Sequence, residues 1–461
     1  MSSSILKSNL QFASQRFVFA ISSFCESYLG IIAGIGGFIF PNINSAIEGY
    51  QSGTAISNIL IIVGKILSFW RLGGTAISLV YIIINFYKLE LKILTIPVWL
   101  GYLTVVAVFS EYANFRQSLF YCVSYSTIAL FCFLILKSEY RMRIINMFFY
   151  IMLFFNTLDV IMLLIWPMGM GDLLGNSICT EGGLEGDRIC NNLWGGHWMA
   201  IPASLNFFAV FVIKFMFVKK NVPLFLFSFA ICMAQLKLCA SGTALLCMAL
   251  MVFASIIVYL FHKQKWLMSI FSPISYYIAG FALTIAIAFF KIQYHFEKQL
   301  EDWFDRDPKL SGREQLFSNA VWLFEHNWVF GSGESLSAPK AVAKLTENAN
   351  FPGVGESQSG ALDIIFFDGI IGLLIFIICI WQVSKSMQMN RTKLPYALLG
   401  VVALGYSFDS VTGSGLWSSS VYIFFAVSCA APFFEKRQDY FPQDYFPRVE
   451  KPISKESPTS S

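Results

Sequence analysis

Charged residues are scarce in this chain: they make up only 13% of the 461 residues. Soluble proteins usually carry about 25%, and a soluble globule of this size would need more charges to cover its surface. The scarcity excludes a disordered chain, a nucleic-acid-binding protein and an ordinary cytosolic enzyme. In their place stand 56% hydrophobic residues, among them 47 Phe, with a mean hydropathy of +0.63. This composition is typical of a polytopic membrane protein whose outer surface contacts lipid.

Several motifs that carry chemistry are also missing. The four histidines are scattered, and the sequence holds no His-x-x-x-His or Cys-x-x-Cys pair for a metal. It has neither a glycine-rich nucleotide loop nor a Ser–His–Asp pattern, and the net charge of +4 is too small to indicate a polyanionic partner. We therefore expect no cofactor, no metal and no nucleic acid.

The cysteines divide into two groups. Eight of the ten lie in apolar runs, where they are best interpreted as buried hydrophobic residues. Cys179 and Cys190 lie together in a polar segment. If that segment faces an oxidising compartment, they form a disulfide that closes a short loop; otherwise they remain free thiols, and the sequence leaves both alternatives open.

Apolar runs of about 20 residues, the length needed to cross a bilayer, recur along the chain. Thirteen candidates are visible, of which two are short. Five candidate runs precede Lys137, but an N-terminus in the cytoplasm requires an even number. We therefore interpret 56–70 and 75–87 as one irregular element or as an interfacial segment. The fold class is then all-α, with about 12 transmembrane helices. The runs are 17–40, 56–70, 75–87, 91–109, 115–136, 144–168, 198–218, 222–240, 243–261, 270–290, 361–383, 394–409 and 416–433.

Basic residues indicate how the chain is oriented. Clusters at 137–143, 219–220, 262–265 and 385–393 are separated by two spans each, as the positive-inside rule requires of cytoplasmic loops. This pattern predicts that both termini are cytoplasmic and that segments 169–197 and 291–360 lie outside. The first apolar run has no small-residue cleavage site, so we expect no cleavable signal peptide.

Four regions follow from this pattern. Residues 1–290 form the first ten or so spans, with the small outer loop 169–197. Residues 291–360 form a large outer loop that carries short helices, residues 361–433 form the C-terminal spans, and the polar tail 434–461 is expected to be disordered. No internal repeat is visible.

The large loop is too long for a passive connector. It begins with an acid-rich, helical stretch from Lys291 to Asp307. A second helix is predicted from Ser311 to Glu325, because Ser311 and Glu314 have capping-box spacing and the apolar residues that follow have helical spacing. It ends near Asn327, before a turn at Gly331.

Arg313 lies in the first turn of that second helix. A guanidinium beside free backbone N–H groups at a helix N-terminus suits a diphosphate. The alternative is a surface ion pair with Glu314 or Glu325, which spacing alone favours.

Motifs in this region resemble those of the O-antigen ligase and polymerase superfamily. Four short patterns agree in order and in loop topology with that family, and the likeness covers roughly residues 180–410. None is specific alone, but four in order around a long loop are a strong signal. They are Gly195-Gly-His197; Ser241-Gly-Thr243-Ala-Leu-Leu; Ser311-Gly-Arg313 with Trp322, His326 and Gly331-Ser-Gly333; and Gln358-Ser-Gly-Ala-Leu-Asp363 with Phe367-Asp-Gly369-Ile-Ile-Gly372.

The sequence also departs from the family pattern. A histidine that the ligases share falls on Gln358, and an arginine of the serine-rich motif falls on Gly242. The resemblance therefore carries over Arg313 and His197, but neither a histidine at 358 nor an arginine at 242. Loss of the histidine favours a polymerase, where the pattern is looser, over a ligase.

The resemblance implies a GT-C-like membrane glycosyltransferase in the bacterial inner membrane. It would transfer glycan from an undecaprenyl-diphosphate-linked donor to a glycan acceptor at the periplasmic face and contact membrane lipid. A diphosphate leaving group needs cationic stabilisation rather than a strong acid. We predict Arg313 as the main cation and Glu356 as the base that accepts the acceptor's proton, with His326 and Asp363 as alternative bases. Substrate-binding candidates are Arg188, His197, Lys237, Arg306, His326 and Gln358.

Lys237 and six other charges lie inside predicted spans. Buried, Lys237 would stand in for the missing arginine; alternatively its ammonium extends to the membrane boundary. The other charges either line a cavity or pair with each other, and the sequence does not pair them. They are Glu26, Lys65, Asp159, Lys214, Asp368 and Asp409.

Three functions remain open at this stage. The first is a polymerase of lipid-linked oligosaccharide repeats for O-antigen, capsule or exopolysaccharide, with a chain-length regulator as a candidate partner protein. The second is a ligase that moves glycan to lipid A core or to protein. The third is a transporter or flippase of lipid-linked sugar, for which broken spans in matching positions of two halves would be expected.

Overall fold

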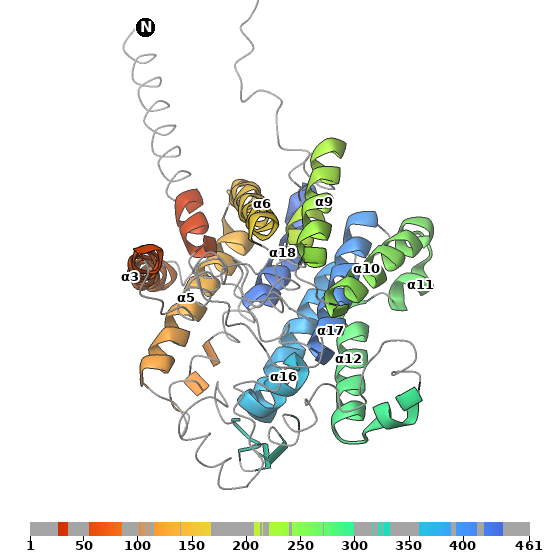
Figure 1. Ribbon diagram of the computed structural model, residues 1–461. Coiled ribbons are helices and arrows are strands. Elements are labelled where there is room, and N and C mark those ends of the chain that lie inside the picture. The colour runs from red at the N-terminus through yellow and green to blue at the C-terminus, as the bar shows by residue number, and fades with distance from the viewer. Residues whose placement is uncertain are drawn as a thin grey trace, which may run out of the picture.

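The computed structural model describes a bundle of helices (Figure 1). The described residues are 26–35, 55–84, 101–102, 105–106, 109, 115–138, 140–166, 207–212, 214, 221–238, 242–270, 272–298, 317, 321–322, 324–325, 327–331, 359–388, 393–412 and 419–436. Within these ranges no strand occurs. The predicted all-α class is thus confirmed, while the number of spans and the outer position of the long loop stay predictions.

The helices coincide with most of the apolar runs. They are α3 (Ala55–Ile84), α5 (Phe115–Lys137), α6 (Arg141–Ile165), α9 (Val222–Leu238), α10 (Gly242–Phe261), α11 (Lys265–Ile270), α12 (Pro273–Ala288), the 3₁₀ helix η5 (Ile292–Phe296), α16 (Gly360–Gln388), α17 (Leu394–Thr412) and α18 (Ser419–Lys436).

Three helices in the described part of the chain are long and apolar enough to cross a membrane: Arg141–Ile165, Asp368–Gln388 and Leu394–Val411. Shorter apolar helices accompany them at Tyr125–Lys137, Val222–Leu238, Leu246–Phe261, Pro273–Ala288 and Val421–Phe433. Apolar side chains also cover the outside of α6, where Phe154 is 62% and Leu164 65% exposed. Large exposed apolar side chains on every turn of a helix indicate contact with lipid.

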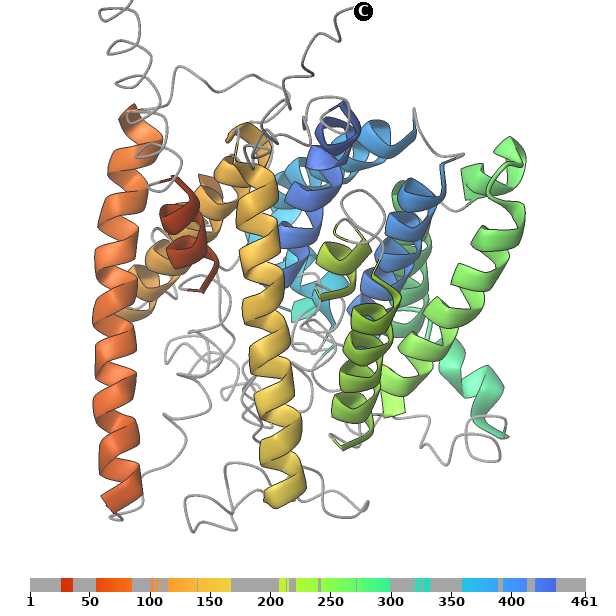
Figure 2. The same cartoon turned by 90° about the horizontal axis from the view of Figure 1, so that it is seen from above.

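The region before Lys137 differs from the expectation of an irregular element. Helix α3 is one continuous α-helix that spans both short apolar runs and the Gly73-Gly74 pair between them. At 1.5 Å per residue it is about 45 Å long. It stands at the edge of the bundle beside α5 (Figure 2), and Lys65 on it is exposed.

Helices α12, α16, α17 and α18 pack closely against one another. Tyr277 of α12, Phe376 of α16 and Phe425 of α18 lie with ring centroids 5.9–6.2 Å apart. Helices α12 and α17 approach closely at Gly280, where a Cβ would collide with the Ser407 Oγ atom. A glycine at such a contact permits two membrane helices to approach each other closely.

Candidate active site

Buried serines just before α16 and in the last turns of α17 form a cluster, which we name the serine end. The Ser359 hydroxyl, just before α16, donates to the Ser410 carbonyl of α17 at 3.1 Å. The Ser407 hydroxyl donates to the Tyr276 carbonyl of α12 at 2.5 Å. Backbone carbonyls thus accept from hydroxyls of neighbouring segments, which holds the start of α16 and the first turn of α12 against the last turns of α17.

Three carboxylates are buried in the same two helices. Asp363 and Asp368 on α16 are 0% and 1% exposed, and Asp409 on α17 is 2% exposed. Asp363 lies in the first turn of α16, where the partial positive charge of the helix N-terminus favours an acid. Ionisable residues inside membrane helices mark functional regions more often than structural ones.

Helix α16 breaks at Gly369, which has φ 63° and ψ −168°. Only glycine adopts this backbone region without strain. The break exposes two N–H groups, and a turn from the long loop accepts both: Ile370 N–H donates to the Trp328 carbonyl at 2.9 Å and Ile371 N–H to the Val329 carbonyl at 3.2 Å. The turn thereby contacts α16 directly, and a Cβ at Gly369 would collide with the Val329 carbonyl oxygen.

Tyr102, which belongs to a third segment, contacts both α16 and the turn of the long loop. Its hydroxyl lies 2.6 Å from the Asp368 carbonyl oxygen and 3.4 Å from the Phe330 carbonyl oxygen, and it can donate to either. Three segments far apart in the sequence therefore meet at the Gly369 break.

The loop also packs along the first turns of α16. Phe317 is buried against Leu362 and Phe366, and the rings of Phe324 and Phe366 lie 5.7 Å apart. The described residues between 317 and 325 are helical, and the chain turns at Asn327–Phe330. The helix and the turn predicted for this part of the loop are confirmed at these positions. At the start of the loop the chain is a 3₁₀ helix, η5, which begins after Lys291 in a left-handed conformation.

Most predicted site residues lie outside the described residues. They are Arg188, His197, Arg306, Arg313, His326, Glu356 and Gln358. In sequence, Arg313 precedes the packed Phe317 by one helical turn, and Glu356 and Gln358 directly precede Ser359. Lys237 is described: it is exposed in the last turn of α9, as required if its ammonium extends to the membrane boundary.

Three of the charged residues predicted inside spans contact polar or aromatic side chains in the structure. Glu26 accepts hydrogen bonds from the Ser138 hydroxyl at 2.6 Å and the Tyr81 hydroxyl at 3.1 Å. Asp159 accepts from the Gln235 amide at 2.8 Å, and the Lys214 ammonium lies 3.6 Å from the centroid of the Tyr150 ring. These three charges are accommodated individually and away from the serine end.

Sequence reasoning missed Gly369 as a break, Tyr102 as a contact of the loop, and the polar pair Asp159–Gln235. Gly369 was visible within a motif, but a lone glycine in an apolar run does not reveal a break. The described residues contain no group of three or more His, Cys, Asp or Glu positioned to bind a metal ion. Carboxylates, hydroxyls and the backbone of the break are the groups that these residues offer.

The all-helical fold with lipid-facing apolar helices defines a multi-pass membrane protein. Residues 196–377 match the model of a protein family described as O-antigen ligase. The match supports the resemblance to the O-antigen ligase and polymerase superfamily that the motifs indicated, whose members act on lipid-linked glycans as membrane glycosyltransferase-like enzymes. No curated protein and no solved structure matches the chain. The match includes the long loop and the Gly369 break, and it does not separate polymerases from ligases.

Proposed function

We propose that this protein polymerises undecaprenyl-diphosphate-linked oligosaccharide repeats into a surface polysaccharide at the periplasmic face of the inner membrane. The family match supports glycan transfer from a lipid carrier. Gln358, in place of the ligases' histidine, supports polymerisation over ligation.

The proposed position of the site rests on one observation. Phe317 and Phe324 of the loop pack on Leu362 and Phe366, at the beginning of α16. The sequence just before Phe317 contains Arg313, and the sequence just before α16 contains Glu356. The packing of Phe317 and Phe324 on the start of α16 supports a shared site for both side chains near the serine end.

The reaction needs two groups. The acceptor hydroxyl attacks the anomeric carbon of the donor sugar, and the bond from that carbon to the diphosphate oxygen breaks with its electrons leaving on the diphosphate. Arg313 stabilises the developing charge on this leaving group. Glu356 accepts the proton of the acceptor hydroxyl. Arg188, His197, Lys237, Arg306, His326 and Gln358 are proposed to bind the diphosphate and the sugars.

The family description keeps a ligase as the second candidate. The discriminating experiment is deletion of the gene, complementation, and separation of surface glycan by length. If the protein is a polymerase, the deletion mutant still displays single repeat units. Unglycosylated acceptor together with accumulated long lipid-linked chains would indicate the ligase instead.

The predicted site is tested by Arg313→Ala, with Lys298→Ala as its control. Lys298 is an exposed cation of the same loop, so its loss matches the change in charge. We expect Arg313→Ala to reduce polymer by about 100-fold or more at unchanged protein level, and Lys298→Ala to retain it. Normal polymer from Arg313→Ala would refute this site.

A further inference from the structure

Helix α16 consists of two parts that meet at the Gly369 break. The part that is long and apolar enough to cross a membrane is Asp368–Gln388, so this span begins at the break. The basic cluster 385–393 lies at its other end, which predicts that the break lies at the outer boundary of the membrane. The first N–H groups of a helix have no acceptor within that helix, and at a membrane they need acceptors from elsewhere.

Three N–H groups after the break find their acceptors outside α16. The turn of the long loop supplies two acceptors, which are the carbonyls of Trp328 and Val329. The next N–H group, that of Gly372, donates to the Tyr102 hydroxyl oxygen. The Tyr102 ring also packs on Gly372, where a Cβ would lie 2.9 Å from the Tyr102 Cε1 atom. Tyr102 therefore binds the first turn of the span beside the turn of the loop.

The Tyr102 hydroxyl lies where the helical hydrogen bonds of α16 are interrupted. In an unbroken helix the Gly372 N–H would donate to the Asp368 carbonyl, four residues earlier. The non-helical backbone of Gly369 lies between these two groups. The hydroxyl contacts both of them: it accepts from Gly372, and its oxygen lies 2.6 Å from the Asp368 carbonyl oxygen, to which it can donate. A side chain inserted between helical donor and acceptor in this way keeps a helix kinked.

From these contacts we propose that Tyr102 is a positioning residue of the glycan-transfer site. Its hydroxyl keeps α16 broken at Gly369, and the break holds the turn of the long loop. The same loop contains Arg313, so the inference rests on the function proposed above. Tyr102 touches neither the substrate nor the reacting atoms, and it acts through the position of the loop.

The first test uses Tyr102→Phe, which removes the hydroxyl and keeps the ring. Hydrogen exchange is followed on the purified full-length protein at the amides of Ile370 and Ile371. These two amides donate to the carbonyls of the turn, so their exchange reports directly whether the turn is bound to α16. We expect both amides to exchange about tenfold faster in the variant, as the loss of one hydrogen bond predicts, while a cooperative thermal transition shows that the protein is folded.

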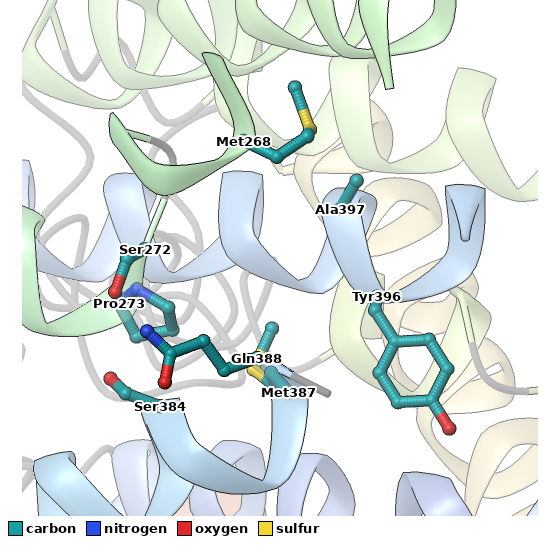
Figure 3. A pocket seen from close by; sticks show the side chains of 8 residues that line it. All are labelled: Met268, Ser272, Pro273, Ser384, Met387, Gln388, Tyr396 and Ala397. Atoms are coloured by element: carbon teal, nitrogen blue, oxygen red, sulfur yellow. The ribbon is translucent and has the colours of Figure 1, made fainter. Parts of the chain in front are cut away.

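The matched control is Ser384→Ala, at the other end of α16. The Ser384 oxygen accepts from Ile274 N–H at 2.9 Å, so this variant also loses one hydrogen bond between α16 and a neighbouring segment. Figure 3 shows Ser384 beside Ser272 and Pro273, where α12 begins. We expect the control to leave exchange at both amides unchanged.

The second test measures chain extension with lipid-linked repeat units extracted from the deletion strain. We expect Tyr102→Phe to lower kcat about tenfold at a nearly unchanged KM, because misplacing a group that acts in the transition state lowers kcat rather than affinity. Ser384→Ala should retain both constants.

A second variant loosens the turn without a change at Tyr102. Ile370→Pro removes the N–H group that donates to the Trp328 carbonyl, at the first helical position after the break, where proline is tolerated. We expect a similar fall in kcat. The double variant Tyr102→Phe/Ile370→Pro should lose less than the product of the two single effects, because both changes act through one contact.

Exchange at the parental rate in Tyr102→Phe would overturn the proposal. Faster exchange with unchanged chain extension, or equal losses of kcat in Tyr102→Phe and Ser384→Ala, would overturn it as well. If the parent protein itself extends no chains, the proposed polymerase is refuted instead, and hydrogen exchange still decides whether Tyr102 holds the turn.

Discussion

Two helix contacts in this molecule bury polar side chains in opposite ways. Where α12, α16 and α17 meet, buried serine hydroxyls donate to backbone carbonyls of adjacent helices. Where α6 meets α9, Asp159 and Gln235 share one hydrogen bond, while both polar atoms of Asn156 and the Gln235 Oε1 atom have no partner. Because an unpartnered polar group in a membrane interior costs free energy, each serine bond spares a donor and an acceptor this cost at the first contact, while Asn156 and Gln235 carry it at the second.

The largest effect is expected from a change at the Gly369 break of α16, where the turn of the long loop contacts that helix. Gly369→Val places a branched side chain in a glycine-only conformation and against the Val329 carbonyl, at a cost of about 3 kcal/mol or more. We expect the melting temperature to fall sharply, and little folded protein to be recovered.

The matched control for this change is Gly73→Ala in α3, where nothing lies within 4 Å of the added Cβ. Helix propensity favours alanine by about 1 kcal/mol, so this variant should be as stable as the parent or more stable. Similar losses in both variants would contradict a special role for Gly369.

The α6–α9 contact is tested by Gln235→Leu, which leaves Asp159 buried without its amide donor. Loss of a hydrogen bond to a charged group predicts destabilisation of about 1–3 kcal/mol. The double variant Asp159→Leu/Gln235→Leu removes both groups and should recover most of this loss. A chemical-unfolding series would measure the coupling, and additive losses would argue against the hydrogen bond.

Asn156→Leu tests the same α6–α9 contact by removing polar atoms that have no partner. Both side-chain polar atoms of Asn156 lack a partner, and the residue is fully buried. Replacing it by an apolar residue of similar size should change stability by less than about 1 kcal/mol, or raise it. A large loss of stability, measured in the same unfolding series, would show that the amide is structurally required.

The smallest effect is expected from Ser407→Ala at the serine end. It removes one hydrogen bond to the Tyr276 carbonyl. Hydrogen bonds between membrane helices contribute about 0.6 kcal/mol on average, so the melting temperature should fall only slightly. Ser228→Ala, whose buried hydroxyl donates within α9 to the Leu224 carbonyl at 2.7 Å, is the control.

The sequence predicted the helices well where an apolar run and a helix have the same ends, as in 115–136 and 222–240. It divided α3 in two because Arg71 and the Gly73-Gly74 pair lower hydropathy there, although helical hydrogen bonds continue through them. An apolar run indicates which residues contact lipid. It does not indicate where the hydrogen bonds of a helix end. For the same reason the break at Gly369, inside an apolar run, could not be predicted.

The chemistry of the candidate site stays a prediction, because Arg313 and Glu356 lie outside the described residues. Motif order pointed to the loop and to the start of α16, and Phe317, Trp328 and Val329 of the loop do contact that helix. The role of Tyr102 could not be predicted, because a contact across more than 200 residues leaves no local pattern. The Asp159–Gln235 pair could not be predicted for the same reason. Two isolated polar residues on separate helices become neighbours only in the folded protein.

The turn at the Gly369 break also determines where a long stretch of chain begins and ends. Gly331 closes the turn with a hydrogen bond from its N–H to the Asn327 carbonyl, and Ser359 leads into α16. Both ends of the intervening segment, which contains Glu356 and Gln358, are therefore attached to one helix, about 15 Å apart at 1.5 Å per residue. Such a closed loop tolerates changes of length at little cost, since doubling it adds only about 0.6 kcal/mol. The length of the segment can therefore change while its two attachment points on α16 stay fixed.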